Sequence, residues 1–175
     1  MMLSAKWRRM VIVATTLLIL LVVNAAIWEK EQHLAEGEVV YLALAPVDPR
    51  SLMQGDYMAL NFALSNEIRR ALQSRRDDDA SRPRDGYAIV RLDEQRVAQF
   101  QRLAEGESTL DNDERRLHYR LRNGQVRLAT DAFFFQEGHA ERYEAASYGR
   151  FRLNAQGEPL LESLHDDDLD ALGDA

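Results

Sequence analysis

The chain contains no cysteine, four prolines and only two lysines, Lys6 and Lys30. Without cysteine, neither disulfides nor thiolate-based catalytic and metal sites can form, so the sequence is indifferent to the redox state of its compartment. The formal charge is −7, and the arginines are interspersed with carboxylates instead of gathered in a basic patch. This charge pattern argues against nucleic acid as a partner.

One long uncharged run stands out in a sequence that is otherwise rich in arginine and carboxylates. Residues 10–28 carry no charge and would span about 28 Å as a helix, close to the thickness of a bilayer's hydrocarbon core. Three cations precede the run (Lys6, Arg8 and Arg9), and the mixed-charge segment 29–31 follows it. By the positive-inside rule, residues 1–9 are expected in the cytoplasm and 10–28 in the lipid bilayer as a transmembrane anchor.

A cleaved signal peptide is the alternative interpretation of this run. Val23-Asn24-Ala25 loosely fits a small-x-small cleavage site after the apolar stretch 10–23. The uncharged block continues past that site to full spanning length, which favours an uncleaved anchor. Removing the three N-terminal cations from −7 leaves −10 for residues 29–175. The expected location is therefore the inner (cell) membrane, single-pass, with an acidic C-terminal domain in the periplasm.

The residues beyond the anchor predict a domain that is mainly β. Residues 29–37 form a polar, helix-compatible stalk ended by Gly37, and residues 38–165 carry short β-branched or alternating runs. Asn123-Gly124 predicts a tight type I′ hairpin. The fold class is a small barrel or sandwich with two short helices, preceded by one transmembrane α-helix. The expected strands are 39–47, 57–64, 87–92, 97–103, 116–122, 125–129, 132–135, 148–153 and 160–164.

Two helices and two irregular segments complete this expectation. Residues 65–76 predict a helix with Ser65 as its N-cap, and 139–147 a helical excursion ended by Gly149. Residues 77–85 are highly charged and predict a mobile loop. Residues 166–175 form an acidic tail, which we expect to be disordered because it lacks the alternating ligands and glycine of a calcium loop.

The most distinctive motif lies within residues 48–62. Its candidate binding residues are Asp48, Pro49, Arg50, Ser51, Gly55, Asp56, Tyr57 and Leu60. A downstream stretch, 134–138, adds Glu137 and Gly138 and is followed by Tyr143, Ala145 and Tyr148-Gly149. Together they resemble the GDYxxLxY family of membrane-anchored proteins, with Phe62 in place of the final tyrosine of the pattern. The resemblance implies an N-terminal anchor and, from the family's usual gene neighbours, association with a multi-span membrane protein.

The motif also has a direct physical interpretation. Pro49 fixes φ at a turn, Gly55 permits a positive φ, and the Asp56 carboxylate can accept backbone N–H groups. A structural corner that leads into a strand is therefore favoured over a catalytic Asp56.

The same stretch also resembles the strand entrance of signal-peptidase-like serine proteases. In those enzymes the position that corresponds to Val47 is the nucleophilic serine, and the base is a lysine of the β domain. The only lysine here beyond the membrane is Lys30, so both halves of a Ser–Lys mechanism are missing and no catalytic residue is predicted. The alternative function is an enzyme or small-ligand sensor on this fold. It would use the Asp56 region with Glu137 or His139, or a barrel mouth for an apolar compound.

The remaining polar and aromatic residues predict contact surfaces more than catalytic or metal-binding sites. The four histidines are scattered without metal-ligand spacing, so no metal and no cofactor is expected. Arg116, Arg120 and Arg122 share a strand face, where they would grip an acidic partner or, as we favour, pair with the domain's own carboxylates. Phe134, between two core phenylalanines, is expected to face a partner groove or the membrane surface. The sequence therefore predicts a non-catalytic, periplasmic-side interaction module, an accessory subunit of an inner-membrane assembly.

Overall fold

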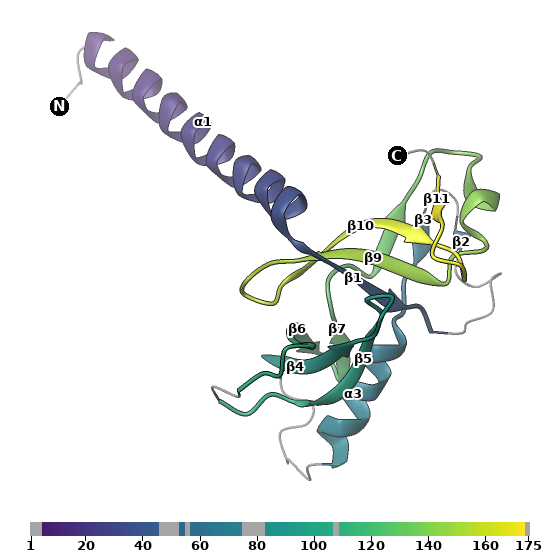
Figure 1. Cartoon of the computed structure of the whole chain (residues 1–175). Coiled ribbons are helices and arrows are strands. Elements are labelled where there is room, and N and C mark those ends of the chain that lie inside the picture. Colours follow the sequence, from purple (N-terminus) through teal and green to yellow (C-terminus); the bar gives the residue numbers. More distant parts are fainter. Residues whose placement is uncertain (1–4, 46–52, 55–56, 75–82, 107–108, 174–175) are drawn as a thin grey trace. The chain divides into compact units, whose positions relative to one another are not determined.

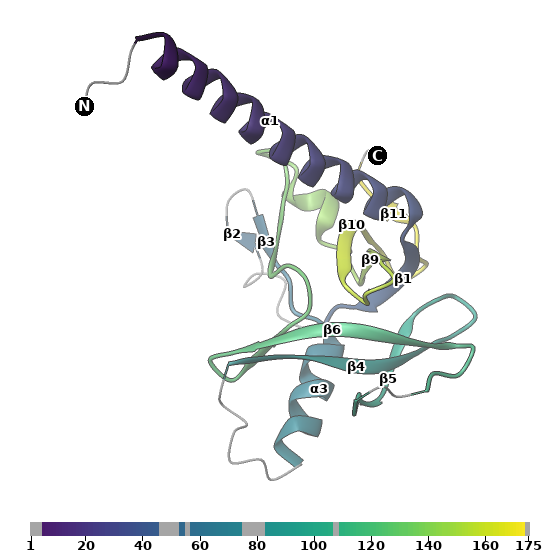
Figure 2. The same cartoon turned by 90° about the vertical axis from the view of Figure 1, so that its left-hand side faces the viewer.

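The structure is a computed structural model that describes residues 5–45, 53–54, 57–74, 83–106 and 109–173 (Figures 1 and 2). The chain divides into two compact units, Met1–Glu36 and Gly37–Ala175. Each unit has its own architecture.

The first unit is a single helix, α1 (Ala5–Glu36). It is long and apolar enough to cross a membrane, a property that signal sequences near an N-terminus share. Its apolar side chains are exposed all around the helix, so no face is set aside for a protein core. Thr16 and Asn24 donate side-chain hydrogen bonds to the carbonyls of Ile12 and Leu20, at 2.9 and 2.8 Å. These two polar side chains of the apolar run thus bond to carbonyls within the helix, as a hydrocarbon environment favours.

The second unit is mainly β, which confirms the predicted β-rich domain after an N-terminal helix. Its antiparallel strands form three sheets (Figure 1). The first sheet has the order β1 (Glu38–Ala43), β9 (Tyr148–Leu153), β10 (Pro159–His165) and β11 (Ala171–Leu172). The second has the order β2 (Met53–Gln54), β3 (Tyr57–Ala59) and β8 (Ala132–Phe134). The third has the order β5 (Ala98–Leu103), β4 (Arg84–Leu92), β6 (Glu114–Arg122) and β7 (Gln125–Arg127).

Helix α3 (Ala63–Ser74) packs against the third sheet (Figure 2). Leu64, Ile68 and Leu72 recur every four residues and are buried, as expected for one face of an amphipathic helix. The helix begins before the predicted start, so Ser65 lies in its first turn and is not its N-cap. The Ser65 amide donates to the Phe62 carbonyl at 3.0 Å.

The predicted second helix is reduced to one 3₁₀ turn, η1 (Ala140–Tyr143). Gly149 does not end this helix, because it lies within β9. A Cβ at Gly149 would come within 2.8 Å of the Phe151 ring and 3.3 Å of the Phe62 ring. The glycine therefore allows two core aromatic side chains to approach the strand closely.

Two tight turns are built on residues with positive φ. Asn123 and Gly124 have φ of 53° and 73° between β6 and β7, which confirms the predicted type I′ hairpin. Gly157, in the β9–β10 turn, has a φ of +80°, and its carbonyl accepts the His118 amide at 2.7 Å. This bond joins the β9–β10 hairpin of the first sheet to β6 of the third.

The expectation of a disordered tail is wrong for the described part of residues 166–175. The Asp166 carboxylate accepts the amides of Asp168 and Asp170, at 3.1 and 2.9 Å. This turn brings β11 back to pair with β10. Hydrogen bonds from backbone amides to the Asp166 carboxylate thus order this segment, although its high negative charge had suggested disorder. Of the predicted loop 77–85, Arg84 and Asp85 belong to β4, and residues 77–82 lie outside the described residues.

Candidate functional site

The predicted motif residues divide between described and undescribed positions. Asp48, Pro49, Arg50, Ser51, Gly55 and Asp56 lie outside the described residues. Tyr57, Leu60, Glu137 and Gly138 are described. The geometry of the motif is therefore established from β3 onward.

The structure pairs the first motif segment with the second. Tyr57 of β3 lies opposite Phe134 of β8, and the centroids of their rings are 5.8 Å apart. The Phe134 side chain is 75% exposed, which confirms the prediction that it is left on the surface. The two parts of the pattern therefore form one short antiparallel ladder with an exposed aromatic ring.

The neighbours of Phe134 are turned the other way. The rings of Phe133 and Phe135 lie 5.1 and 5.3 Å from the Tyr143 ring of η1. A Cβ at Gly173 would come within 2.5 Å of the Tyr143 hydroxyl, so the C-terminal segment packs closely on this same residue. This alternation fixes which ring of the 133–135 run remains outside.

The end of the motif enters the core. Leu60 and Phe62 are 7% and 3% exposed, and the Leu60 amide donates to the Asp131 carbonyl at 2.8 Å. The Phe62 ring meets that of Phe151 edge to face, with centroids 5.4 Å apart and planes at 72°. A phenylalanine here supplies an aromatic core contact without a hydroxyl that would need a partner.

Glu137 and Gly138 continue the chain from β8 into an exposed turn. Both residues are exposed, and Gly138 has a φ of +82° with open space around the position of a Cβ. His139 donates its amide to the Gln136 carbonyl at 3.0 Å, closing the turn. Gly138 is thus explained by backbone conformation.

A polar cavity of about 310 Å³ lies beside the end of the motif. It is lined by residues that follow β3, by the first turns of α3, and by β7 with the segment after it. The polar lining residues are Asn61, Ser65, Asn66, Arg69, Gln125, Arg127 and Asp131. Arg127 pairs with Asp131 at 2.8 Å. Sequence reasoning missed this cavity because its walls come from segments about sixty residues apart, of which only residues 60–62 belong to the motif.

A second hollow, near Glu144 and Ser147, is lined by the acidic residues Asp166, Asp167 and Asp168. No group of three or more metal-ligating side chains comes together among the described residues. These two hollows are walled largely by polar groups, so neither of them is suited to an apolar compound.

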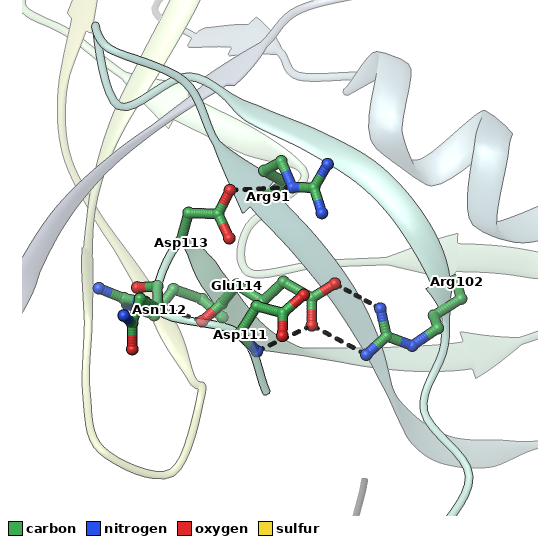
Figure 3. A network of polar contacts seen from close by, with 7 residues as sticks. Arg91, Arg102, Asp111, Asn112, Asp113 and Glu114 are labelled. Carbon is green, nitrogen blue, oxygen red and sulfur yellow. Dashed lines mark hydrogen bonds and ion pairs between the residues drawn. The ribbon is translucent and has the colours of Figure 1, made fainter. Parts of the chain in front are cut away.

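A cluster of polar contacts joins β5 and β6 (Figure 3). Glu114, with a side chain 2% exposed, pairs with Arg102 and accepts the Asp111 amide at 3.2 Å. The hydrogen bonds from Arg102 hold the pKa of the Glu114 carboxyl at about 2. Asp113 turns instead to Arg91, at 3.0 Å. A carboxylate so firmly ionised cannot exchange protons near neutral pH, so Glu114 serves to pin the connection between the strands.

The predicted arginine row on β6 is engaged within the domain. Arg122 pairs with Asp85 at 2.7 Å, and Arg120 donates to the Ala129 carbonyl at 3.1 Å. Arg116 also has an interaction within the chain. For Arg122, pairing with the domain's own carboxylates is therefore confirmed.

Sequence reasoning also missed a serine–histidine pair on β10. The Ser163 hydroxyl lies 3.0 Å from His165 Nε2, and His165 Nδ1 lies 2.8 Å from the Leu169 carbonyl. That carbonyl can only accept, so Nδ1 carries a proton, and in the neutral imidazole Nε2 then accepts from Ser163. The order of groups is that of a nucleophile, a base and an orienting acceptor. However, His165 is only 4% exposed, and neither residue lines either cavity above. Its evident effect is to tie the C-terminal turn to β10.

Comparison with known proteins identifies a family. No curated protein and no solved structure matches the chain. The model of the GDYXXLXY protein family matches residues 19–164, from within α1 to β10. That range holds the Tyr57–Phe134 ladder and the polar cavity, and it stops one residue before His165. The chain belongs to the GDYXXLXY protein family.

Proposed function

We propose that this protein is a membrane-anchored, non-catalytic interaction module, an accessory subunit of an assembly in the inner membrane. In this proposal α1 stays in the lipid bilayer with its N-terminus in the cytoplasm, and the β-rich domain lies on the periplasmic side. The partner is a multi-span membrane protein. The orientation follows from the cations before the apolar run of α1.

The single observation that carries the proposal is the exposure of Phe134. A phenylalanine that is 75% exposed leaves most of its apolar area in water, which is unfavourable unless a partner covers it. The ring sits directly opposite Tyr57 in the ladder formed by the family's two pattern segments. Aromatic side chains of this kind are the residues that anchor protein–protein contacts.

The test is site-specific photo-crosslinking of the full-length protein in its native membranes. A photoreactive phenylalanine analogue replaces Phe134, and adducts are identified by mass spectrometry. A specific adduct with a multi-span membrane protein is the expected result. The matched control places the same analogue at Tyr87, another exposed aromatic residue, 38% exposed and on the third sheet. We expect no such adduct from position 87.

Two outcomes would contradict the proposal. One is recovery of the position-134 variant only as a monomer without adducts, with extraction in several detergents giving no copurifying protein. The other is the same set of adducts from positions 134 and 87, which would show diffuse proximity and no defined contact surface.

A further inference from the structure

The polar cavity beside α3 has features of a ligand site that the proposed function does not use. It is formed by residues 60–62, which follow β3, by the first turns of α3, and by β7 together with Asp131. At about 310 Å³ it is at the small end of ligand pockets, suited to one amino-acid-sized group.

Several polar side chains in this cavity have capacity to bind. In the part of the chain that the structure describes, the side chains of Asn61, Ser65 and Gln125 make no hydrogen bond; Ser65 as a residue is 8% exposed. Ser65 lines the cavity, so its hydroxyl is available to a ligand bound there.

The charged side chains that line the cavity indicate which class of ligand it can bind. Arg69 donates to the Asn66 side-chain oxygen at 2.7 Å, and no carboxylate pairs with it among the described residues. Arg127 already pairs with Asp131. Two guanidinium groups and one carboxylate leave a local charge of +1, and the positive end of α3 adds to it. A single negative charge neutralises this set, whereas a phosphate dianion would leave the site with a net charge of −1.

We propose that this cavity binds a carboxylate group through Arg69 and Arg127, with Asn61, Ser65 and Gln125 bonding polar atoms beside that group. The planar guanidinium of arginine suits the two oxygens of a carboxylate. Binding here does not depend on contacts at Phe134, so either proposal can fail while the other holds.

The test follows backbone amide signals of the full-length protein in detergent micelles by NMR during titration. The probe is N-acetyl-glutamate α-amide, which carries one carboxylate flanked by amides. Saturable shifts at Ser65, Asn66 and Arg127 are expected. Arg69→Gln should weaken binding by about tenfold or more, since charge-assisted hydrogen bonds are worth at least that factor. Arg70→Gln is the matched control, because Arg70 is exposed on the same helix and does not line the cavity; it should leave binding unchanged.

A second variant guards against loss of folding as an explanation. Asp131→Asn removes the competing carboxylate and keeps both arginines, so the probe should bind severalfold more tightly. Absence of saturable shifts, equal binding by Arg69→Gln, or tighter binding of inorganic phosphate than of the probe would overturn the proposal.

A second experiment tests whether the bound carboxylate belongs to a partner protein or to a small molecule. A photo-crosslinker at Gln125, an exposed position on the cavity wall, is activated in native membranes. A protein adduct that excess probe suppresses assigns the carboxylate to a partner protein. Probe binding without any such adduct assigns it to a small molecule.

Discussion

Glu114, at the start of β6, binds Arg102 of β5 with both of its carboxylate oxygens. The carboxylate is almost completely buried, whereas the arginine side chain is 45% exposed. The bond from the Asp111 amide uses the same carboxylate. The buried carboxylate of Glu114 therefore binds the end of β5, the start of β6 and the segment that connects these two strands.

The first prediction is a dependence of stability on acid pH. The pKa of Glu114 is lowered from 4.5 to about 2, chiefly by the Arg102 hydrogen bonds. The pKa of Glu38 is also lowered, chiefly by its hydrogen bond from Arg115. Because the folded pKa lies below the unfolded value, the stabilisation is complete above about pH 4.5 and is lost as the pH falls toward 2. Thermal unfolding of the full-length protein in detergent, followed by circular dichroism from pH 7 to 2, should show this decline.

The Glu114→Gln variant shows how much of this pH dependence comes from the Glu114–Arg102 pair and how much comes from the domain's other carboxylates. The variant should melt several degrees below the wild type at pH 7, because Arg102 and the Asp111 amide lose their ionised acceptor. The difference should narrow as the pH falls and the wild-type carboxylate is protonated. A difference that stays constant from pH 7 to 2 would show that Glu114 acts through packing alone. Glu94→Gln, an exposed change in the β4–β5 turn, is the control and should follow the wild type.

The sequence predicted the elements whose signals are local. Asn123-Gly124 determined the β6–β7 hairpin because only residues that tolerate positive φ fit a type I′ turn. The alternation of residues 116–122 likewise predicted most of β6. The exposure of Phe134 followed from alternation within an aromatic run.

Features that depend on distant partners were not predictable in this way. Gly149 resembled a helix terminator by position, but its small size serves the rings of Phe62 and Phe151 in the core. The Glu114–Arg102 pair and the polar cavity join segments that only the sheet pairing brings together. Charge patterning suggested a disordered tail because it does not register the Asp166 side-chain bonds that close the turn.

The second prediction compares two glycines with nearly the same positive φ. Gly157→Ala and Gly138→Ala both place a side chain at positive φ, +80° and +82°, at a cost of about 1 kcal/mol each. At Gly157 the new Cβ would also lie 2.6 Å from the Arg116 carbonyl oxygen, whereas Gly138 has open space. Gly157→Ala should therefore lower the free energy of unfolding by about 2–4 kcal/mol in total, measured by urea denaturation. Equal losses in both variants would show that β6 moves freely away from the hairpin turn.

The third prediction concerns the histidine on β10. His165→Ala removes the acceptor of Ser163 and the donor to Leu169, and leaves both groups poorly satisfied, so a loss of about 2–3 kcal/mol is expected. Ser163→Ala should cost only about 1 kcal/mol, because the Nδ1 bond to Leu169 remains. Hydrogen exchange should accelerate most at the amides of residues 168–172 in the His165 variant. A Ser163→Ala protein that is as stable as wild type, yet fails to complement a deletion strain, would instead indicate that the pair performs chemistry.

The fourth prediction separates the exposed ring of β8 from its buried neighbours. Phe134→Ser removes a side chain that is 75% exposed, so the free energy of unfolding should change by no more than about 0.5 kcal/mol. Phe133→Ser removes a ring that packs on Tyr143 and should cost about 2–4 kcal/mol, with a matching fall in the abundance of the protein in cells. The comparison requires urea denaturation of both purified variants together with complementation by the full-length genes. If Phe134 is a contact residue, its variant is stable and abundant but fails to complement, whereas the Phe133 variant loses activity only in proportion to its folded population. A Phe134→Ser protein that complements fully would mean that the exposed ring contributes nothing to function, and the partner surface would then have to lie elsewhere on the domain.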